Sequence, residues 1–206
     1  MGFAKKQGVD PSALQKIETD KGVYAGFRRV SEARSLEQVL QSALPASIAA
    51  MSFPKTMRWG AGTYRFVRPV HWVVALHGPA VVNLELFGVA AGRASEGHRF
   101  LAPGPVVLGH ADSYVDALRA AFVLVEPEAR RAKMVGDLDA AAAGAGGTVV
   151  SDDALLDEVV DLVEWPGIVA GGFDPSFLEL PHKILVTTLK HHQKSFSVRG
   201  KDGLLP

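Results

Sequence analysis

Hydrophobic residues recur at intervals of three and four in several stretches of the chain, which is the spacing of one face of an α-helix. The first stretch covers residues 36–44 and follows Ser35, a suitable N-cap, while Pro45 should end or restart that helix because it lacks an N–H. Residues 111–121 also read as helical. Residues 126–143 predict a longer helix with Pro127 in its first turn, stopped by the glycines that follow.

Two further helices are predicted in the last third of the chain. Ser151 can cap the first of them, and Trp165-Pro166 should end it. Its buried stripe would consist of five aliphatic residues at helical spacing: Leu155, Leu156, Val159, Val160 and Val163. Pro181 should open the second helix, which reaches about Gln193.

Short apolar runs between the helices predict strands. Residues 70–77 and 81–89 flank Gly78-Pro79 and indicate a hairpin. Shorter strands are expected over residues 122–125, 167–172 and 195–199. A turn over residues 200–203 then leaves the last strand without a partner before Pro206, as in a piece truncated at its C-terminus.

This alternation predicts an α+β fold, with a mixed β-sheet flanked by helices. We place a boundary near Phe53, between a small N-terminal α/β segment (residues 1–53) and an α+β domain (residues 54–206). Trp72 and Trp165 are expected in the core, whereas Trp59 suits either the core or stacking on a nucleobase.

Composition adds little to this prediction. Twenty-two acidic residues balance twenty-two Lys and Arg, so no net field draws the whole chain to nucleic acid or to a membrane. The absence of cysteine excludes disulfides and fits a reducing cytoplasm. No apolar run approaches the roughly 20 residues that cross a bilayer, so no membrane partner is expected.

The charges are nevertheless segregated along the chain. Residues 55–68 hold four basic residues and no acid, interleaved with Trp59, Tyr64 and Phe66. Residues 151–164 hold six acids and no Lys or Arg, whereas residues 182–201 hold five Lys and Arg and no acid. Such blocks are either binding faces or solvated helix faces, and the last block could also pair with the acidic helix.

Eight residues are candidates for contact with an RNA backbone, because cationic side chains neutralise phosphates. They are Arg58 and Arg68 in the first basic segment, Arg93, His98 and Arg99 around the sequence G-H-R-F, and Lys183, Lys190 and Lys194 on one face of the last helix. Phe100 and Leu101 are expected to anchor the G-H-R-F loop in the core. The alternative for the arginines of this loop region is an ion pair with Glu96 or Glu164.

Motifs for catalysis and metal binding are not found in the sequence. It has no G-x-x-x-x-G-K-[ST] phosphate loop, no H-E-x-x-H pair and no Cys/His cluster. We therefore predict no catalytic residue and no metal site in this chain.

Six motifs occur in a specific order along the chain. They are F-P-K-T-M-R-W-G (residues 53–60), F-V-R-P-V-H-W (66–72), G-H-R-F-L (97–101), L-V-E-W-P (162–166), F-L-E-L-P (177–181) and K-H-H-Q-K-S-F (190–196). In this order they resemble the beta subunit of the two-subunit bacterial glycyl-tRNA synthetase, along essentially the whole chain. Ser195 and the double histidine before Gln193 depart from that pattern.

The resemblance implies a fold similar to the editing-module-like domain of phenylalanyl-tRNA synthetase beta chains. It implies a cytoplasmic glycine–tRNA ligase whose partners are an alpha subunit and tRNA(Gly), and in which ATP with Mg²⁺ is used through the alpha subunit. It implies no cofactor in this chain, whose expected role is to position tRNA and organise the subunits.

Two other functions stay open. One is an editing deacylase of mischarged tRNA with His98 near a cleft, although a site for glycine, the smallest amino acid, has little need of a second sieve. The other is a purely structural module at a subunit interface.

Overall fold

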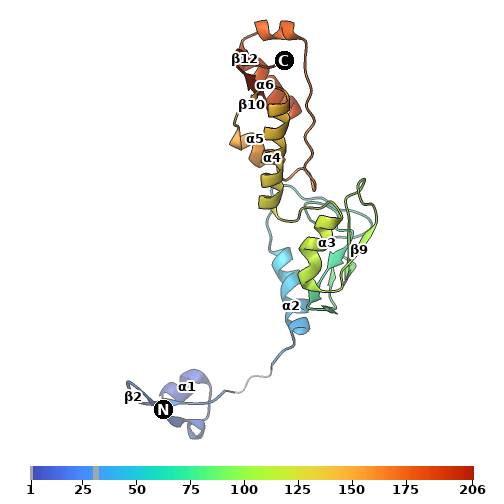
Figure 1. Cartoon of the computed structure of the whole chain (residues 1–206). Coiled ribbons are helices and arrows are strands. Elements are labelled where there is room, and N and C mark those ends of the chain that lie inside the picture. The colour runs from blue at the N-terminus through green and yellow to red at the C-terminus, as the bar shows by residue number, and fades with distance from the viewer. Residues whose placement is uncertain (1, 30–32) are drawn as a thin grey trace.

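The computed structural model describes residues 2–29 and 33–206, and it has the predicted α+β fold, with helices and short strands in several small sheets (Figure 1). For description we divide these residues into an N-terminal part (residues 2–29), a β-rich part (residues 33–125) and a helical part (residues 126–206). No helix in the described ranges is both long and apolar enough to span a membrane.

The N-terminal part is a small unit of one helix and one hairpin. Helix α1 (Gly2–Gln7) and the 3-10 turn η1 (Pro11–Ala13) precede strands β1 (Gln15–Thr19) and β2 (Gly22–Gly26), which pair antiparallel. The rings of Phe3 and Phe27 lie 6.3 Å apart, and the Arg29 guanidinium donates to the Gln7 carbonyl at 3.2 Å. Most of its side chains are exposed, so this unit has little core of its own.

Helix α2 (Leu36–Ala49) opens the β-rich part and starts where the sequence predicts. The Ser35 hydroxyl accepts from the Gln38 N–H at 3.2 Å, and the Gln38 side chain accepts from the Ser35 N–H at 3.0 Å. This reciprocal capping box confirms the predicted N-cap. The expectation that Pro45 ends or restarts the helix is wrong, because α2 continues through it to Ala49. The carbonyl that loses its donor belongs to Gln41, an exposed residue, where water can replace the missing bond.

Two hydrogen bonds connect α2 to the strands that follow. The Gln41 amide donates to the Asn83 carbonyl at 2.6 Å, and the Asn83 N–H donates to the Glu37 carboxylate at 3.0 Å. In this structure α2 therefore contacts residues on the other side of Phe53, and a domain boundary there stays a prediction.

The predicted hairpin forms around Gly78-Pro79, where β4 (Leu76–His77) pairs antiparallel with β5 (Ala80–Val81). Gly78 has a φ of 57°, a conformation that glycine adopts without steric cost. The strands are shorter than predicted, because the chain turns again at Phe87 and Gly88 between β6 (Glu85–Leu86) and β7 (Val89–Gly92).

Strand β3 (Val73–Val74) pairs parallel with β7, which also pairs antiparallel with β6, and this three-stranded arrangement is the predicted mixed sheet. Trp72 precedes β3, and its side chain is 47% exposed, so its predicted place in the core is wrong. The similarity to the phenylalanyl-tRNA synthetase module stays a prediction.

Strands β8 (Ala94–Glu96) and β9 (Pro105–Val107) form a second hairpin, followed by η2 (Ala111–Ser113) and α3 (Tyr114–Ala120), where a helix is predicted. Five buried residues form the core of the β-rich part: Val82, Leu84, Leu108, Leu118 and Leu124. The predicted strand over residues 122–125 is wrong. The chain turns at Phe122, with a φ of 57°, and the Val123 N–H caps α3 by donating to the Leu118 carbonyl at 2.8 Å.

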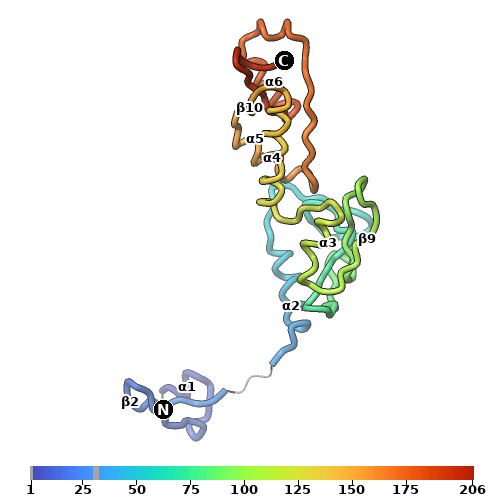
Figure 2. Tube along the Cα trace, in the orientation of Figure 1, coloured from blue at the N-terminus to red at the C-terminus, as the bar shows by residue number. Residues whose placement is uncertain are grey.

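The helical part contains three helices and a small sheet. The helices are α4 (Pro127–Gly144), α5 (Asp153–Val159) and α6 (His182–Gln193), and the 3-10 turn η3 (Pro175–Glu179) precedes α6. The strands are β10 (Thr148–Val149), β11 (Val198–Gly200) and β12 (Gly203–Leu204). An extended segment joins α5 to η3 and runs along this part of the molecule (Figure 2). Five core residues, Met134, Leu138, Leu155, Leu156 and Val159, hold α4 and α5 together.

Four predictions fail in the helical part. Asp152 rather than Ser151 caps α5, with its carboxylate accepting from the Leu155 N–H at 3.0 Å. Helix α5 ends at Val159, well before Trp165, and Val163 is 42% exposed. Residues 167–172 form no strand, and the Val169 side chain there is 93% exposed.

The fourth failure concerns β11. It pairs with β10 on one side and β12 on the other, so its partners lie within the chain.

Trp165 is partly enclosed, as expected for a packing residue. Its ring meets Phe122 edge-on at 5.2 Å, and the Lys133 ammonium lies 5.3 Å from the ring centre.

Candidate nucleic-acid interface

The basic segment of the β-rich part exposes its charges, and its aromatic rings pack against Phe87. Lys55, Arg58, Arg65 and Arg68 are all exposed, and none of them forms an ion pair with another described residue. The rings of Trp59, Tyr64 and Phe66 instead surround Phe87, with ring centres 5.7, 5.9 and 5.0 Å from it. The aromatic residues thus support the segment that carries Arg58 and Arg68.

Arg93 is held by backbone carbonyls rather than left free for a ligand. Its guanidinium donates to the Leu108 carbonyl at 3.2 Å and to the Pro79 carbonyl at 3.1 Å. Its expected alternative partners, Glu96 and Glu164, form no ion pair with it. Arg93 therefore ties the β4–β5 turn to the end of β9, and its contribution to a phosphate site stays a prediction.

The loop between β8 and β9 presents Arg99 at the surface. The His98 Nδ1 accepts from the N–H groups of Phe100 and Leu101, both at 3.2 Å, and so shapes the loop. The predicted anchoring of this loop in the core is wrong, because Phe100 is 81% and Leu101 52% exposed. Backbone bonds hold the loop instead: the His98 N–H donates to the Ala121 carbonyl, and the Ala102 N–H to the His98 carbonyl.

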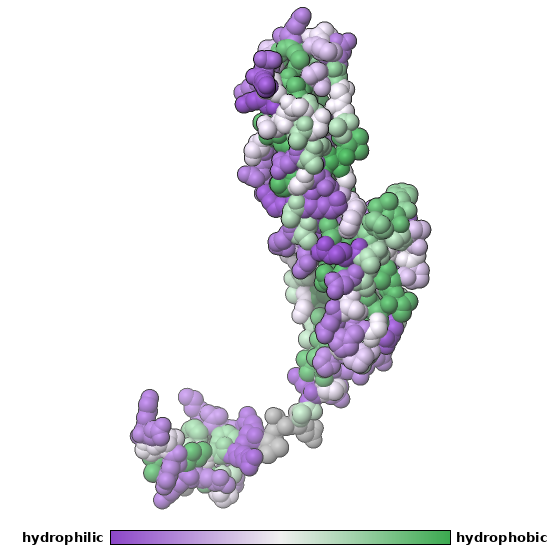
Figure 3. All heavy atoms as spheres, viewed as in Figure 1, coloured by the Kyte–Doolittle hydropathy of each residue, from purple (hydrophilic) through white to green (hydrophobic). Residues whose placement is uncertain are grey.

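Exposed apolar residues accompany Arg99. Together with Val107, which is 67% exposed, Phe100 and Leu101 add to the hydrophobic surface at the β8–β9 hairpin. Figure 3 shows hydrophobic residues gathered on this side of the β-rich part, near the β9 label of Figure 1.

Two of the three candidate lysines on α6 are neutralised by α5. The Lys190 ammonium lies 2.6 Å from the Asp152 carboxylate, and the Lys194 ammonium lies 2.6 Å from that of Glu158. The hydrogen bond from Lys190, with a second from the Leu155 N–H, lowers the pKa of Asp152 below its ordinary value. Lys183 is exposed and forms no ion pair among the described residues.

Lys194 also ends α6 in an unusual way. It adopts the left-handed conformation, with a φ of 54°, a position usually taken by glycine at the end of a helix.

Helix α4 forms ion pairs with three further acids of this segment. Arg131 bridges Asp153, at 3.1 Å, and Asp157, while Arg130 lies 2.5 Å from Asp161. Arg130 also donates to the carbonyls of Leu124, Val125 and Val160. Five of the six acids between residues 151 and 164 thus form ion pairs with α4 or α6.

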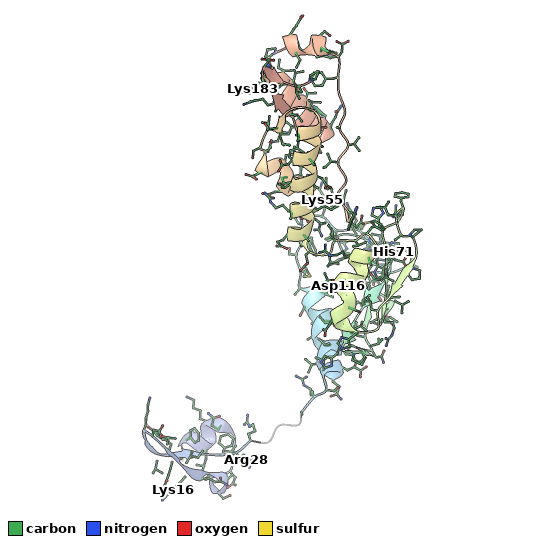
Figure 4. All side chains as sticks on the ribbon, in the orientation of Figure 1. Lys16, Arg28, Lys55, His71, Asp116 and Lys183 are labelled. Carbon is green, nitrogen blue, oxygen red and sulfur yellow. The ribbon has the colours of Figure 1, made fainter. Side chains whose placement is uncertain are left out.

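Three of the eight candidate residues thus have partners within the chain, because Lys190 and Lys194 form ion pairs and Arg93 donates to backbone carbonyls. Figure 4 places Lys183 toward the far end of the helical part, away from Lys55 in the β-rich part. Arg58, Arg68 and Arg99 stay exposed candidates in the β-rich part. Whether any of the eight residues binds tRNA stays a prediction.

The β-rich part also contains two cavities that are not predicted from the sequence. One, of about 570 Å³, lies between the end of α2 and the Phe87 turn, and its walls include Ile48, Phe53, Tyr64 and Phe66. The other, of about 450 Å³, lies between β3, β8 and the start of α3. No sequence pattern marks either cavity, because each is made by residues from three or more separate segments.

No group of three or more His, Asp or Glu side chains in the described residues is arranged to hold a metal ion. The described residues also present exposed cations, exposed aromatic residues and two cavities.

The comparisons specify the family. A family model described as "Glycyl-tRNA synthetase beta subunit" matches residues 1–206, and the chain belongs to this family. It is 42% identical over 205 residues to a glycine–tRNA ligase beta subunit of Nitratidesulfovibrio vulgaris, and 44% identical over 204 residues to one of Xanthomonas campestris. Each alignment covers 99% of this chain but 29% of the relative, so the chain spans under a third of the length of these relatives.

Proposed function

We propose that this chain serves a glycine–tRNA ligase by positioning tRNA(Gly) and organising the subunits, without carrying the active site. The matching relatives are named as beta subunits of that ligase, which supports a separate alpha subunit as partner. ATP with Mg²⁺ would be used through the alpha subunit in the cytoplasm, and we derive no step of that reaction from the residues of this chain.

The observation that carries the proposal is the exposed basic segment at residues 55–68. Its four cations have no acidic partner among the described residues, whereas five of the six acids of residues 151–164 are already paired. Cations in this state can neutralise phosphates without first breaking an internal ion pair. The rings packed on Phe87 stabilise the segment, so fewer conformations are lost when it binds.

The helical part suits the second half of the role, which is subunit organisation. Phe177 lies on η3, Leu180 directly follows η3 and Ile184 lies on α6, and these side chains are 51%, 42% and 53% exposed. Neighbouring exposed apolar residues of this kind favour contact with another protein surface.

A salt titration of tRNA(Gly) binding tests the RNA contact. If Lys55, Arg58 and Arg68 each neutralise one phosphate, replacing all three with glutamine should weaken binding and reduce the log–log salt slope by about 2 to 3. Lys190→Gln is the matched control, because that lysine is already paired with Asp152 and should leave the slope unchanged. An unchanged slope in the triple variant, or an equal reduction in the control, would contradict the proposal.

A further inference from the structure

The smaller cavity has the volume of a ligand site. Its volume of about 450 Å³ lies within the roughly 300–1,000 Å³ of small-molecule pockets. Its apolar walls are Val74, Leu76 and Leu108, and Trp72 lies at the cavity with nearly half of its surface exposed. The cavity therefore offers apolar side walls and one large aromatic ring that is open to solvent.

Two residues that carry hydroxyl groups, Ser95 and Tyr114, line this cavity. Ser95 on β8 is only 5% exposed, and Tyr114 at the start of α3 is half-buried. No side-chain hydrogen bond within the described ranges involves either hydroxyl, and neither oxygen is fully enclosed without a partner. Since both residues line the cavity, we infer that their hydroxyls reach solvent through it, where a ligand could replace water.

The charges around the cavity restrict the ligand. None of the seven lining residues (Trp72, Val74, Leu76, Ser95, Leu108, Ala111 and Tyr114) is charged at neutral pH. A phosphate or a free amino acid would lose its hydration here without gaining an ionic partner. A flat, uncharged ring with donors and acceptors at its edge could stack on Trp72 and bond to the two hydroxyls.

We propose that this cavity, between Trp72, Ser95 and Tyr114, binds one unpaired nucleobase. The base would belong to an unpaired RNA nucleotide whose phosphates stay outside the cavity. This identification of the ligand as RNA rests on the proposed function. Because stacking uses the face of the ring that every base has, the site should accept several bases with small preferences.

Saturation-transfer NMR and calorimetric titrations of the 206-residue chain with adenosine test the site directly. Trp72→Leu keeps the side chain apolar but removes the stacking ring, and it should weaken adenosine binding by about 5- to 100-fold. Trp72→Phe should restore most of the affinity. Ser95→Ala should weaken binding by about 2- to 10-fold, the effect of one lost hydrogen bond. Trp59→Leu is the matched control, since Trp59 lies against Phe87 outside this cavity, and it should leave binding unchanged.

Parallel titrations with ATP and with a single-stranded tetraribonucleotide distinguish the source of the base. Tighter binding of the tetranucleotide than of adenosine, lost in Trp72→Leu, supports RNA as the source, whereas tighter binding of ATP would overturn it. If adenosine does not saturate the folded chain at millimolar concentration, the proposed site is wrong. The site is also wrong if toluene binds more tightly than adenosine and Ser95→Ala leaves toluene binding unchanged. Adenosine is uncharged, so its binding to the cavity does not depend on the salt-dependent contact with tRNA phosphates. The cavity proposal and the proposed function can therefore fail separately.

Discussion

The β-rich part and the helical part use their charged residues in opposite ways. In the helical part the acids of residues 152–161 are bonded to α4 and α6, so charge holds helices together. In the β-rich part the cations of residues 55–68 have no such partner among the described residues and face solvent. The difference shows that a basic run becomes available to a ligand only where the fold brings no acidic run beside it.

The comparison predicts that an apolar core, more than the ion pairs, stabilises the helical part. Leu155 is 1% exposed and packs between α4 and α5, so Leu155→Ala should lower the free energy of unfolding by about 2–5 kcal/mol. Urea denaturation followed by circular dichroism measures the change. Leu162→Ala is the control, since that side chain is 66% exposed and its loss should cost under about 0.5 kcal/mol. A cost for Leu155→Ala as small as that of the control would mean that the apolar core contributes little to the stability of the helical part.

Arg130 should be the most important charged residue of the helical part. Its side chain is 13% exposed and bonds to three carbonyls and Asp161, so Arg130→Gln should cost about 1.5–3 kcal/mol. Arg119 on α3 is a matched arginine that is exposed, and Arg119→Gln should change the free energy of unfolding by under about 0.5 kcal/mol. Equal melting temperatures for the two variants would show that the bonds of Arg130 do not stabilise the helical part more than an exposed arginine stabilises the β-rich part.

The β-rich part should respond to loss of a local cap rather than of an ion pair. Ser35→Ala removes half of the capping box of α2 and should cost about 1 kcal/mol. Ser47→Ala, on the exposed surface of the same helix, is the control and should be nearly neutral. Denaturation midpoints decide between them, and a neutral Ser35→Ala would show that the bonds to Asn83 position α2 without the cap.

The smallest expected effect is the pH dependence of the Asp152–Lys190 pair. Because the folded state lowers the pKa of Asp152 below its ordinary value of 3.8, this carboxylate stabilises the fold above that pH and loses its contribution as the pH falls below it. Asp152→Asn keeps a capping side chain but removes the charge. The variant should therefore be less stable than the parent at pH 7, and the difference should shrink between pH 4 and pH 2 in thermal melts. A difference independent of pH would assign the effect to capping alone.

Features set by neighbouring residues could be predicted from the sequence. Ser35 and Gln38 are three residues apart and recognise each other, and Gly78 turns the chain between two apolar runs, so both features follow from local chemistry. The α4 and α6 helices were located within about one residue for the same reason.

Features that depend on distant partners could not be predicted. Ser151 and Asp152 are both good capping residues, and the contact with Lys190 on α6 accompanies the choice of Asp152. Residues 167–172 have the composition of a buried strand, but no described strand pairs with them. The cavity of Trp72, Ser95 and Tyr114 likewise exists only once three separate segments are packed.

Lys194 both ends α6 in the left-handed conformation and pairs with Glu158, and glycine could do only the first. A glycine at this position would relieve the left-handed backbone, as it commonly does at helix ends, but it would leave Glu158 without its cation. The end of α6 and its attachment to α5 are thus set by one residue. A substitution that removes the lysine side chain should therefore weaken the contact between α6 and α5.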